Sequence, residues 1–302
     1  MIPAPPRSAP ARIAPARSAP AQQSVRPESR AWKKLKSSRS ALFGLIIVGF
    51  FVIISLAAPL LPIPDPIATD WGAVRKAPSA AHWLGTDELG RDILSRMIWG
   101  ARASLTAGVV SVLIAVLIGV PFGLVAGYFG GWVDMIVSRV TDALLATPFL
   151  ILAIALAAFL GPSLTNAMIA IGLSAMPVFV RLTRGQVLSV KTEDYVEGAR
   201  AIGLTDTAIM ARYILPNVFA PVLVQATLTV ATAIIAEASL SFLGLGQQPP
   251  DPSWGSMLNV AKNFMTQAPW MAWWPGAAIF SVVLGFNLLG DGLRDALDPR
   301  EG

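Results

Sequence analysis

Long apolar stretches without charge alternate with shorter polar segments along this chain. Residues 41–64, 103–133, 143–180, 213–236 and 263–290 contain no Asp, Glu, Lys or Arg. A helix needs about 20 apolar residues to cross the hydrocarbon of a bilayer. Each stretch is long enough, so the pattern predicts an all-α integral membrane protein.

The third stretch is too long for one crossing and contains Gly-Pro-Ser-Leu-Thr-Asn at residues 161–166. Such a turn-forming run ends one helix and starts another. The sequence therefore predicts six transmembrane helices, near residues 41–61, 103–127, 137–160, 164–182, 217–241 and 276–293. Pro148 would allow a kink in the third, because its nitrogen cannot donate to the helix ladder.

Composition supports a membrane protein and excludes several classes of site. Of the 302 residues, 54% are hydrophobic and 14% are charged, which is more apolar side chain than one soluble core buries. The absence of cysteine excludes disulfides, and a single histidine, His82, excludes zinc motifs that need two. No Gly is followed by Lys, so the chain has no G-x-x-x-x-G-K-[ST] loop and should not hydrolyse ATP unaided.

Charge at the two ends of the spans predicts the orientation. Residues 1–40 form a basic tail rich in Pro and Ala, a composition typical of disorder, and several Lys and Arg precede the first span. Positive charge concentrates on the cytoplasmic side of membrane proteins. Six crossings then place both termini in the cytoplasm. The loop after the fourth span lies on the same side and holds Arg181, Arg184, Lys191, Arg200 and Arg212.

Within the spans, small and charged residues suggest specific contacts. Gly119, Gly123 and Gly127 repeat every fourth residue, which predicts close packing of one helix face against another helix of this chain or of a second subunit. Asp142 and Glu237 need a partner or an aqueous cavity, because unpaired charge in a bilayer is costly. Asp142 could pair with Arg139, three residues earlier. Glu237 is a candidate gate or pore residue, or a carboxylate at the outer interface.

The segment 190–216 is polar enough to lie in water. Apolar residues at helical spacing within 195–204 (Val196, Ala199, Ile202 and Leu204) predict a short amphipathic helix. Gly203 would end it, and Thr205 or Asp206 would cap a second. Two such helices would form a projection that inserts its apolar face into a groove on a partner, with Glu197 and Arg200 on the rim. On periodicity alone, a helix lying on the lipid surface is the first choice.

The same segment resembles the EAA loop of bacterial ABC-importer permeases. The residues that match the spacing of that motif are Glu197, Ala199, Gly203, Leu215 and Pro216, whereas Gly198 and Tyr213 depart from it. Residues 82–92, 95–96, 100–102, 237–246 and 254–255 also resemble the dipeptide and oligopeptide permease family, specifically its C-type subunit. The resemblance covers nearly the whole chain beyond residue 40.

This resemblance implies a type I ABC importer permease fold in a bacterial inner membrane. Residues 41–99 would be the first span with an extracytoplasmic loop, and residues 100–302 a five-helix core whose loop 190–216 couples to the ATPase. The implied partners are a homologous second permease, one or two cytoplasmic ATPase subunits that bind the ATP and Mg²⁺, an extracytoplasmic binding protein and lipid. No nucleic acid and no cofactor of the chain itself is expected.

The implied substrate is a dipeptide or oligopeptide, although related systems import nickel complexes or other small solutes. An alternative from another class is a proton-coupled secondary transporter that uses Glu237 or Asp142 as a proton relay. That alternative leaves the motif at residues 197–216 unexplained. An enzyme is not expected, because no nucleophile, base or metal constellation is present.

Overall fold

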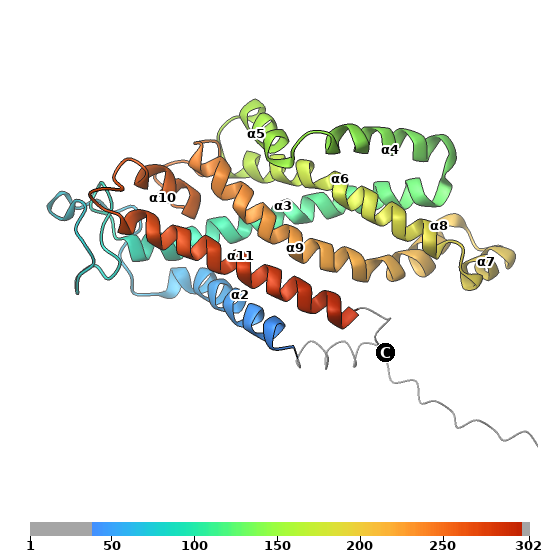
Figure 1. Cartoon of the computed structure of the whole chain (residues 1–302), viewed down its shortest axis with the longest axis horizontal. Helices are drawn as coiled ribbons and strands as arrows, with labels where there is room; N and C mark the ends of the chain where they lie inside the picture. Colours follow the sequence, from blue (N-terminus) through green and yellow to red (C-terminus); the bar gives the residue numbers. More distant parts are fainter. Residues whose placement is uncertain (1–37, 298–302) are drawn as a thin grey trace, which may run out of the picture.

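The computed structural model describes residues 38–297, which are helical apart from loops and one isolated bridge between Thr86 and Asp92. The predicted tail lies outside the described residues except for residues 38–40. In chain order the helices are α2 (Arg39–Ala57), η1 (Ala58–Leu60), η2 (Trp71–Ala73), α3 (Ile93–Phe129), α4 (Gly131–Leu145), α5 (Phe149–Leu160), α6 (Leu164–Val190), α7 (Asp194–Ala201), α8 (Asp206–Ile209), η3 (Met210–Ile214), α9 (Leu215–Phe242), α10 (Trp254–Ala261) and α11 (Trp270–Leu297) (Figure 1).

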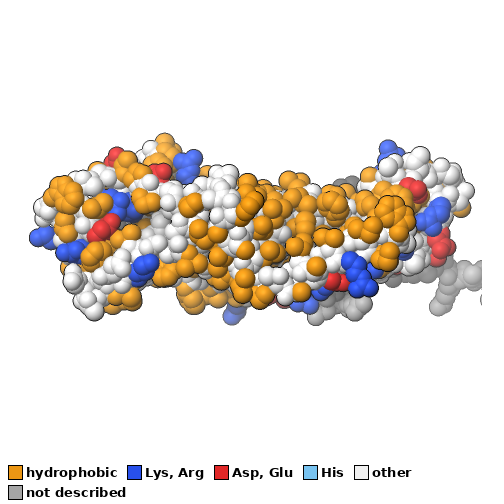
Figure 2. All heavy atoms as spheres, turned by 90° about the horizontal axis from the view of Figure 1, so that it is seen from above, with side chains coloured by type: hydrophobic (Ala, Val, Ile, Leu, Met, Phe, Trp, Pro, Cys, Tyr) orange, Lys and Arg blue, Asp and Glu red, His pale blue; other side chains and the backbone are white. Residues whose placement is uncertain are grey.

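Five helical stretches are long and apolar enough to cross a membrane. They are Arg39–Leu60, Ile93–Phe129, Leu164–Val190, Asp206–Phe242 and Trp270–Leu297. Figure 2 shows hydrophobic side chains over the middle of the molecule, with most charged side chains toward its two ends. Exposed apolar residues of the long helices include Ile46 of α2 and Leu117 and Phe122 of α3. Such a surface is stable only against lipid or other apolar helices.

The third predicted span is two helices rather than one. α4 and α5 meet at a bend of 92°, and Pro148 directly precedes the first residue of α5. Proline removes a helical hydrogen bond and disfavours helical backbone at the preceding residue, so the expected kink is a break. Twelve residues of α5 extend only about 18 Å, less than the thickness of the hydrocarbon. The prediction of one continuous helix over 137–160 is therefore corrected, and the pair forms a sixth crossing only when taken together.

Helical structure also extends beyond the predicted spans. α3 starts at Ile93 rather than near residue 103, because the Asp92 side chain accepts a hydrogen bond from the Ser95 N–H at 2.9 Å and caps the helix. α10 lies in a segment predicted as loop. Its start is a reciprocal capping box between Ser253 and Ser256, a spacing visible in the sequence.

The core is built on the pairing of α3 with α6, the most extensive contact between helices. A Cβ atom at Gly119, Gly123 or Gly127 would lie 2.8 Å or less from an atom of α6. Only the absence of side chains allows the two backbones to approach this closely. The glycine repeat therefore packs against a helix of the same chain, which confirms one of the two predicted possibilities.

The molecule has two distinct ends (Figure 1). The loop 61–92, α10 and the first turns of α3 and α11 gather at one end. The start of α2, the end of α11 and the pair α7 and α8 lie toward the other. We call these the loop end and the α7 end.

Candidate functional site

The segment between α6 and α9 projects at the α7 end, beyond the long helices (Figure 1). We call α7, the turn at residues 202–205 and α8 the knob. α7 carries Asp194 and Glu197 in its first turn and Arg200 in its last. This distribution of charge is the one that the helix dipole stabilises. A short, isolated helix therefore gains support from its own sequence.

The turn between the two helices has a defined geometry. Gly203 has a φ of +82°, a left-handed conformation that favours glycine. Its N–H donates to the Arg200 carbonyl at 3.0 Å, and the Leu204 N–H donates to the Ala199 carbonyl at 3.2 Å. This is a Schellman motif, which satisfies the last carbonyl groups of α7. The Thr205 side chain accepts a hydrogen bond from the Ala208 N–H and caps α8. The predicted helix end at Gly203 and cap at Thr205 are confirmed.

The knob continues into the membrane helix without a break. Residues Met210–Ile214 form a π-helical stretch, and α9 starts at Leu215. In an α-helix the ring of Pro216 would clash with the carbonyl of Arg212, and wider turns relieve this clash. The Asn217 side chain donates to the Tyr213 carbonyl at 2.6 Å. Leu215 and Pro216 thus shape the junction rather than the tip of the knob.

The apolar face of α7 is divided between the chain itself and solvent. Val196 and Ala199 are buried in the core of this chain, whereas Ile202 is 75% exposed. Glu197 and Arg200 are exposed on the same helix. The prediction that all four apolar residues face a partner is therefore corrected. Three of them (Val196, Ala199 and the half-buried Leu204) pack against the core of this chain, and Ile202 is the one of the four left at the surface.

Glu237 lies at the other end of α9, where it is fully buried. The hydroxyl of Ser104, on α3, donates to one carboxylate oxygen at 2.9 Å, and the hydroxyl of Ser241 donates to the other at 2.7 Å. The same Ser104 oxygen accepts from the Trp254 N–H at 3.3 Å, and the Ser241 oxygen accepts from the Gln247 N–H at 3.0 Å. The carboxylate thus joins α3 and α9 to the loop and helix α10. Sequence reasoning selected Glu237 but missed Ser104, because nothing in the pattern relates residues so far apart.

The other intramembrane acid, Asp142, lies at an exposed position. Its carboxylate pairs with Arg181 of α6 at 2.6 Å rather than with Arg139. The expected partner within α4 is therefore wrong, because α6 brings a guanidinium group closer than the same helix does.

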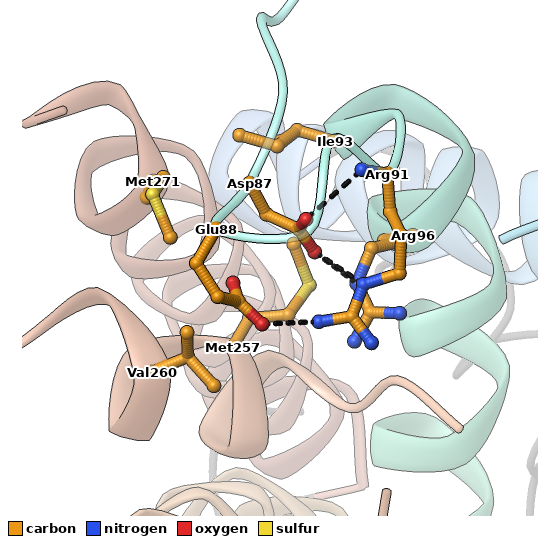
Figure 3. A pocket seen from close by; sticks show the side chains of 8 residues that line it. All are labelled: Asp87, Glu88, Arg91, Ile93, Arg96, Met257, Val260 and Met271. Atoms are coloured by element: carbon orange, nitrogen blue, oxygen red, sulfur yellow. Dashed lines mark hydrogen bonds and ion pairs between the residues drawn. The ribbon is translucent and has the colours of Figure 1, made fainter. Parts of the chain in front are cut away.

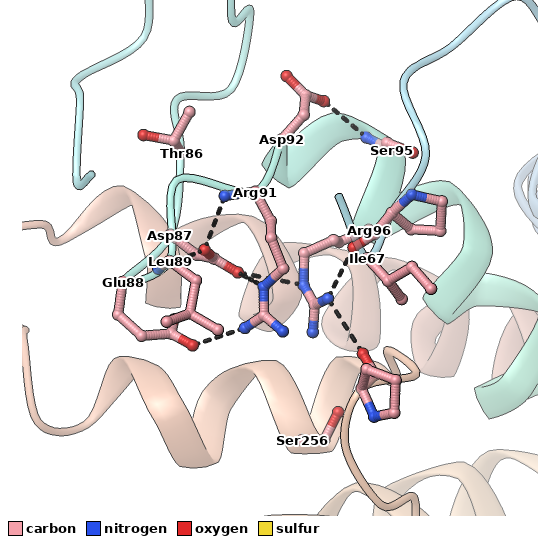
Figure 4. A network of polar contacts seen from close by, with 12 residues as sticks. Ile67, Thr86, Asp87, Glu88, Leu89, Arg91, Asp92, Ser95, Arg96 and Ser256 are labelled. Carbon is pink, nitrogen blue, oxygen red and sulfur yellow. Dashed lines mark hydrogen bonds and ion pairs between the residues drawn. The ribbon is translucent and has the colours of Figure 1, made fainter. Parts of the chain in front are cut away.

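A charged cluster lies at the loop end, in the region that includes residues 82–96 (Figure 4). The Arg91 guanidinium group pairs with Asp87 at 2.6 Å and with Glu88 at 2.5 Å, and Arg96 lies 3.3 Å from Asp87. Burial, followed by the neighbouring charge of Asp87, raises the pKa of Glu88 above its usual value. Arg96 also donates to the Pro66 carbonyl at 2.8 Å, so the cluster holds the loop against α3.

This cluster borders α10. Figure 3 shows Glu88 directed toward Met257 and Val260 of that helix. A cleft of about 330 Å³ lies beside it, lined among others by Arg91, Gln248 and Asn259. Among the described residues, no group of three His, Asp or Glu side chains is arranged to hold a metal ion.

Comparison with known proteins identifies the family. Residues 119–302 match the family of binding-protein-dependent transport system inner membrane components, and residues 27–78 match the N-terminal transmembrane domain of oligopeptide transport permease C. The chain belongs to this permease family. It is a C-type permease of the dipeptide and oligopeptide group, as the sequence motifs predicted.

The permease has relatives similar along most of their length. It is 48% identical over 277 residues to the dipeptide transport system permease protein DppC of Alkalihalophilus pseudofirmus, covering 92% of this chain and 91% of the relative. It is 45% identical over 280 residues to the glutathione transport system permease protein GsiD of Pectobacterium atrosepticum, covering 92% and 93%.

Solved structures confirm the fold of the permease. An inward-facing structure of the MetNI methionine ABC transporter aligns with a TM-score of 0.56 at 20% identity, covering 68% of this chain and 98% of that chain. A second match, to an amino acid ABC transporter crystallised with histidines, has a TM-score of 0.52 at 18% identity and covers 67% and 95%. The protein is therefore a multi-pass permease of the bacterial inner membrane with a type I ABC importer fold.

Membership of the family also sets the class of partner. Its members are membrane components of importers that work with ATPase and binding-protein partners, consistent with a chain that is not itself an enzyme. The matched range 119–302 contains both the knob and Glu237.

Proposed function

We propose that this permease imports dipeptides or oligopeptides by alternating access, driven by separate ATPase subunits that contact the knob. The observation that carries the proposal is the structure of the knob. Val196 and Ala199 pack the knob against the core of the chain, and Glu197, Arg200 and Ile202 are exposed at its surface. One relative is named for dipeptide transport and another for glutathione, a small peptide.

In this proposal the α7 end faces the cytoplasm. The start of α2 and the end of α11 lie toward that end (Figure 1). The end of α6, the knob and the stretch that follows it carry Arg184, Lys191, Arg200 and Arg212. Clustered Lys and Arg are typical of cytoplasmic loops. The loop end would then face outward, where a binding protein delivers substrate.

ATP can drive transport only by binding one conformation of the complex better than another. A rigid projection seated on an ATPase subunit would convey this preference to the membrane helices. The knob is suited to this task, because its turn is satisfied by its own hydrogen bonds and its base is buried. We propose that ATP and Mg²⁺ bind on one or two ATPase subunits, and that a homologous second permease completes the pathway.

Glu237 is proposed as part of the gate at the loop end. Its carboxylate joins α3, α9 and the segment leading into α10, so separation of these elements would break its hydrogen bonds. A gate residue of this kind acts by holding the closed state together, not by contacting substrate.

The proposal is tested at the knob by replacing Ile202 with Glu. We expect the ATPase subunit to be lost when the tagged complex is purified in mild detergent, because a charge replaces the apolar side chain at the contact. Dipeptide uptake into membrane vesicles should fall in parallel. A matched control for retention of the ATPase subunit is Trp83→Glu, since Trp83 is 71% exposed but lies in the loop 61–92 at the opposite end.

Retention of the ATPase subunit and normal uptake in Ile202→Glu would show that the knob is not the contact. Recovery of the wild-type permease as a homo-oligomer without an ATPase subunit would instead support the proton-coupled carrier.

A further inference from the structure

The last turn of α3 is attached directly to the knob. The Tyr128 hydroxyl donates a hydrogen bond to the Asp206 carboxylate at 2.6 Å, and Asp206 is the first residue of α8. Tyr128 itself is only 8% exposed and packs in the main hydrophobic core. The bond therefore joins a fixed side chain of a membrane helix to an exposed residue of the knob.

Two further contacts attach the last turn of α3 to neighbouring segments. The Arg200 guanidinium group, in the last turn of α7, lies 5.9 Å from the centroid of the Tyr128 ring, within the range of a cation–π interaction. The Lys191 ammonium group donates to the carbonyl of Gly127 at 2.9 Å. Tyr128 thus contacts both helices of the knob, and its neighbour is bound to the end of α6.

α3 is suited to carry a displacement over a long distance. From Ser104 to Tyr128 it extends about 36 Å at 1.5 Å per residue. Along part of this length its glycines are in backbone contact with α6, which leaves no space for the helix to bend toward that neighbour. At its far end, Ser104 donates to Glu237. One continuous helix, which contains Pro121 and is packed against α6, therefore connects the knob to the carboxylate at the loop end.

We propose that Tyr128 is the positioning residue through which movement of the knob is passed to α3. The inference rests on the proposed function, because it assumes that the ATPase subunit moves the knob. It adds the specific route: Asp206 and Arg200 pull or push Tyr128, α3 shifts along α6, and the contact between Ser104 and Glu237 changes at the opposite end.

A role of Tyr128 in transmitting movement can be distinguished from a role in stability alone. If Tyr128 only stabilised the fold, its loss would lower the amount of complex but leave the substrate moved per ATP unchanged. If it transmits movement, the complex should assemble and hydrolyse ATP while moving less substrate. A hydrogen bond to a charged acceptor corresponds to a change of about tenfold in an equilibrium, which sets the expected size of the effect.

The test uses the full complex in proteoliposomes, with Tyr128→Phe in this chain. The variant keeps the ring beneath Arg200 and removes only the hydroxyl. We expect normal recovery of the ATPase subunit and a ratio of dipeptide transported to ATP hydrolysed that falls about tenfold. Asp206→Ala, which removes the acceptor, should lower the ratio too, and the double variant should be no worse than Tyr128→Phe, because both remove the same bond.

Tyr213→Phe is the matched control. Tyr213 lies outside the knob, in the π-helical stretch Met210–Ile214, where it is half-buried, and its hydroxyl makes no hydrogen bond to any described residue, so the ratio of this variant should equal that of the wild type. An unchanged ratio in Tyr128→Phe, or a lowered ratio caused by loss of the ATPase subunit, would overturn the inference and leave the proposed function intact. Absence of an ATPase subunit from the wild-type complex would overturn the proposed function itself.

Discussion

Replacing Gly123 with alanine tests how tightly α3 packs on α6. A Cβ atom at this position would lie 2.6 Å from the Val180 carbonyl oxygen and 3.1 Å from the Arg184 amide nitrogen, whereas ordinary contact begins at 3.4 Å. Both of these atoms belong to the backbone of α6 and cannot rotate away. The two helices would have to separate along the most extensive interface in the chain.

The magnitude follows from two opposing effects. Alanine in a helix is about 1 kcal/mol more favourable than glycine, whereas overpacking costs about 1–3 kcal/mol. Because the clash is with backbone, we expect the upper part of that range and a net loss of about 1–2 kcal/mol of unfolding free energy. Gly123→Val should lose more, since its two methyl groups must also be accommodated.

Unfolding of the purified chain in mixed detergent micelles, followed by far-ultraviolet circular dichroism as the fraction of dodecyl sulfate rises, measures this difference. The matched control is Gly185→Ala on α6, where no atom lies within 4 Å of the added methyl group. That variant should be as stable as the wild type or up to about 1 kcal/mol more stable. If Gly123→Ala were as stable as Gly185→Ala, the close contact between α3 and α6 would be refuted.

Three further results are expected. Glu237→Leu should lower the unfolding free energy by about 2–3 kcal/mol in the same assay, because two buried hydroxyl groups lose their acceptor. Glu237→Gln should cost less, because its side chain can still accept a hydrogen bond. A Glu237→Leu variant as stable as the wild type would argue against the network. Glu88→Gln should raise the thermal midpoint at pH 7. The pKa of Glu88 is raised in the folded chain, so its ionised form destabilises the fold and glutamine removes that cost. The difference in midpoint between the two proteins should vanish as the pH falls toward 4.5, where Glu88 is protonated. A midpoint difference independent of pH would contradict this. Asp142→Asn should change stability by less than about 1 kcal/mol, since its ion pair with Arg181 is exposed; a larger loss would indicate that the pair is shielded from water.

Local signals in the sequence predicted the knob well. Gly203 and Thr205 act within their own turn, so the helix end and the cap depend on neighbours a few residues away. The same is true of Asp92, whose cap on α3 could have been recognised from its position before an apolar run. The orientation of the apolar residues could not be predicted in this way. Val196 and Ile202 are equally apolar, and only the position of the rest of the chain decides which is covered.

Partners distant in sequence were beyond local reasoning. Asp142 has a candidate partner three residues away, yet Arg181 on α6 is the one that reaches it. Ser104 and Tyr128 are unremarkable as residues, and their roles come from facing Glu237 and Asp206 on other elements. The break at Pro148 was expected as a kink, but the angle of 92° depends on how α4 and α5 pack beside α6.

The sequence by itself determined that the chain lies in a membrane, where five of its six predicted spans fall, and which residues end and cap the knob. These properties follow from apolar length and from backbone preferences, which act over a few residues. The tertiary structure alone decided which face of α7 is free, what Glu237 binds and that one helix connects it to the knob. The first depends on how α8 and the stretch 210–214 fold against α7. The other two depend on hydrogen bonds between residues 78 and 133 positions apart, and such a contact exists only once the helices have packed.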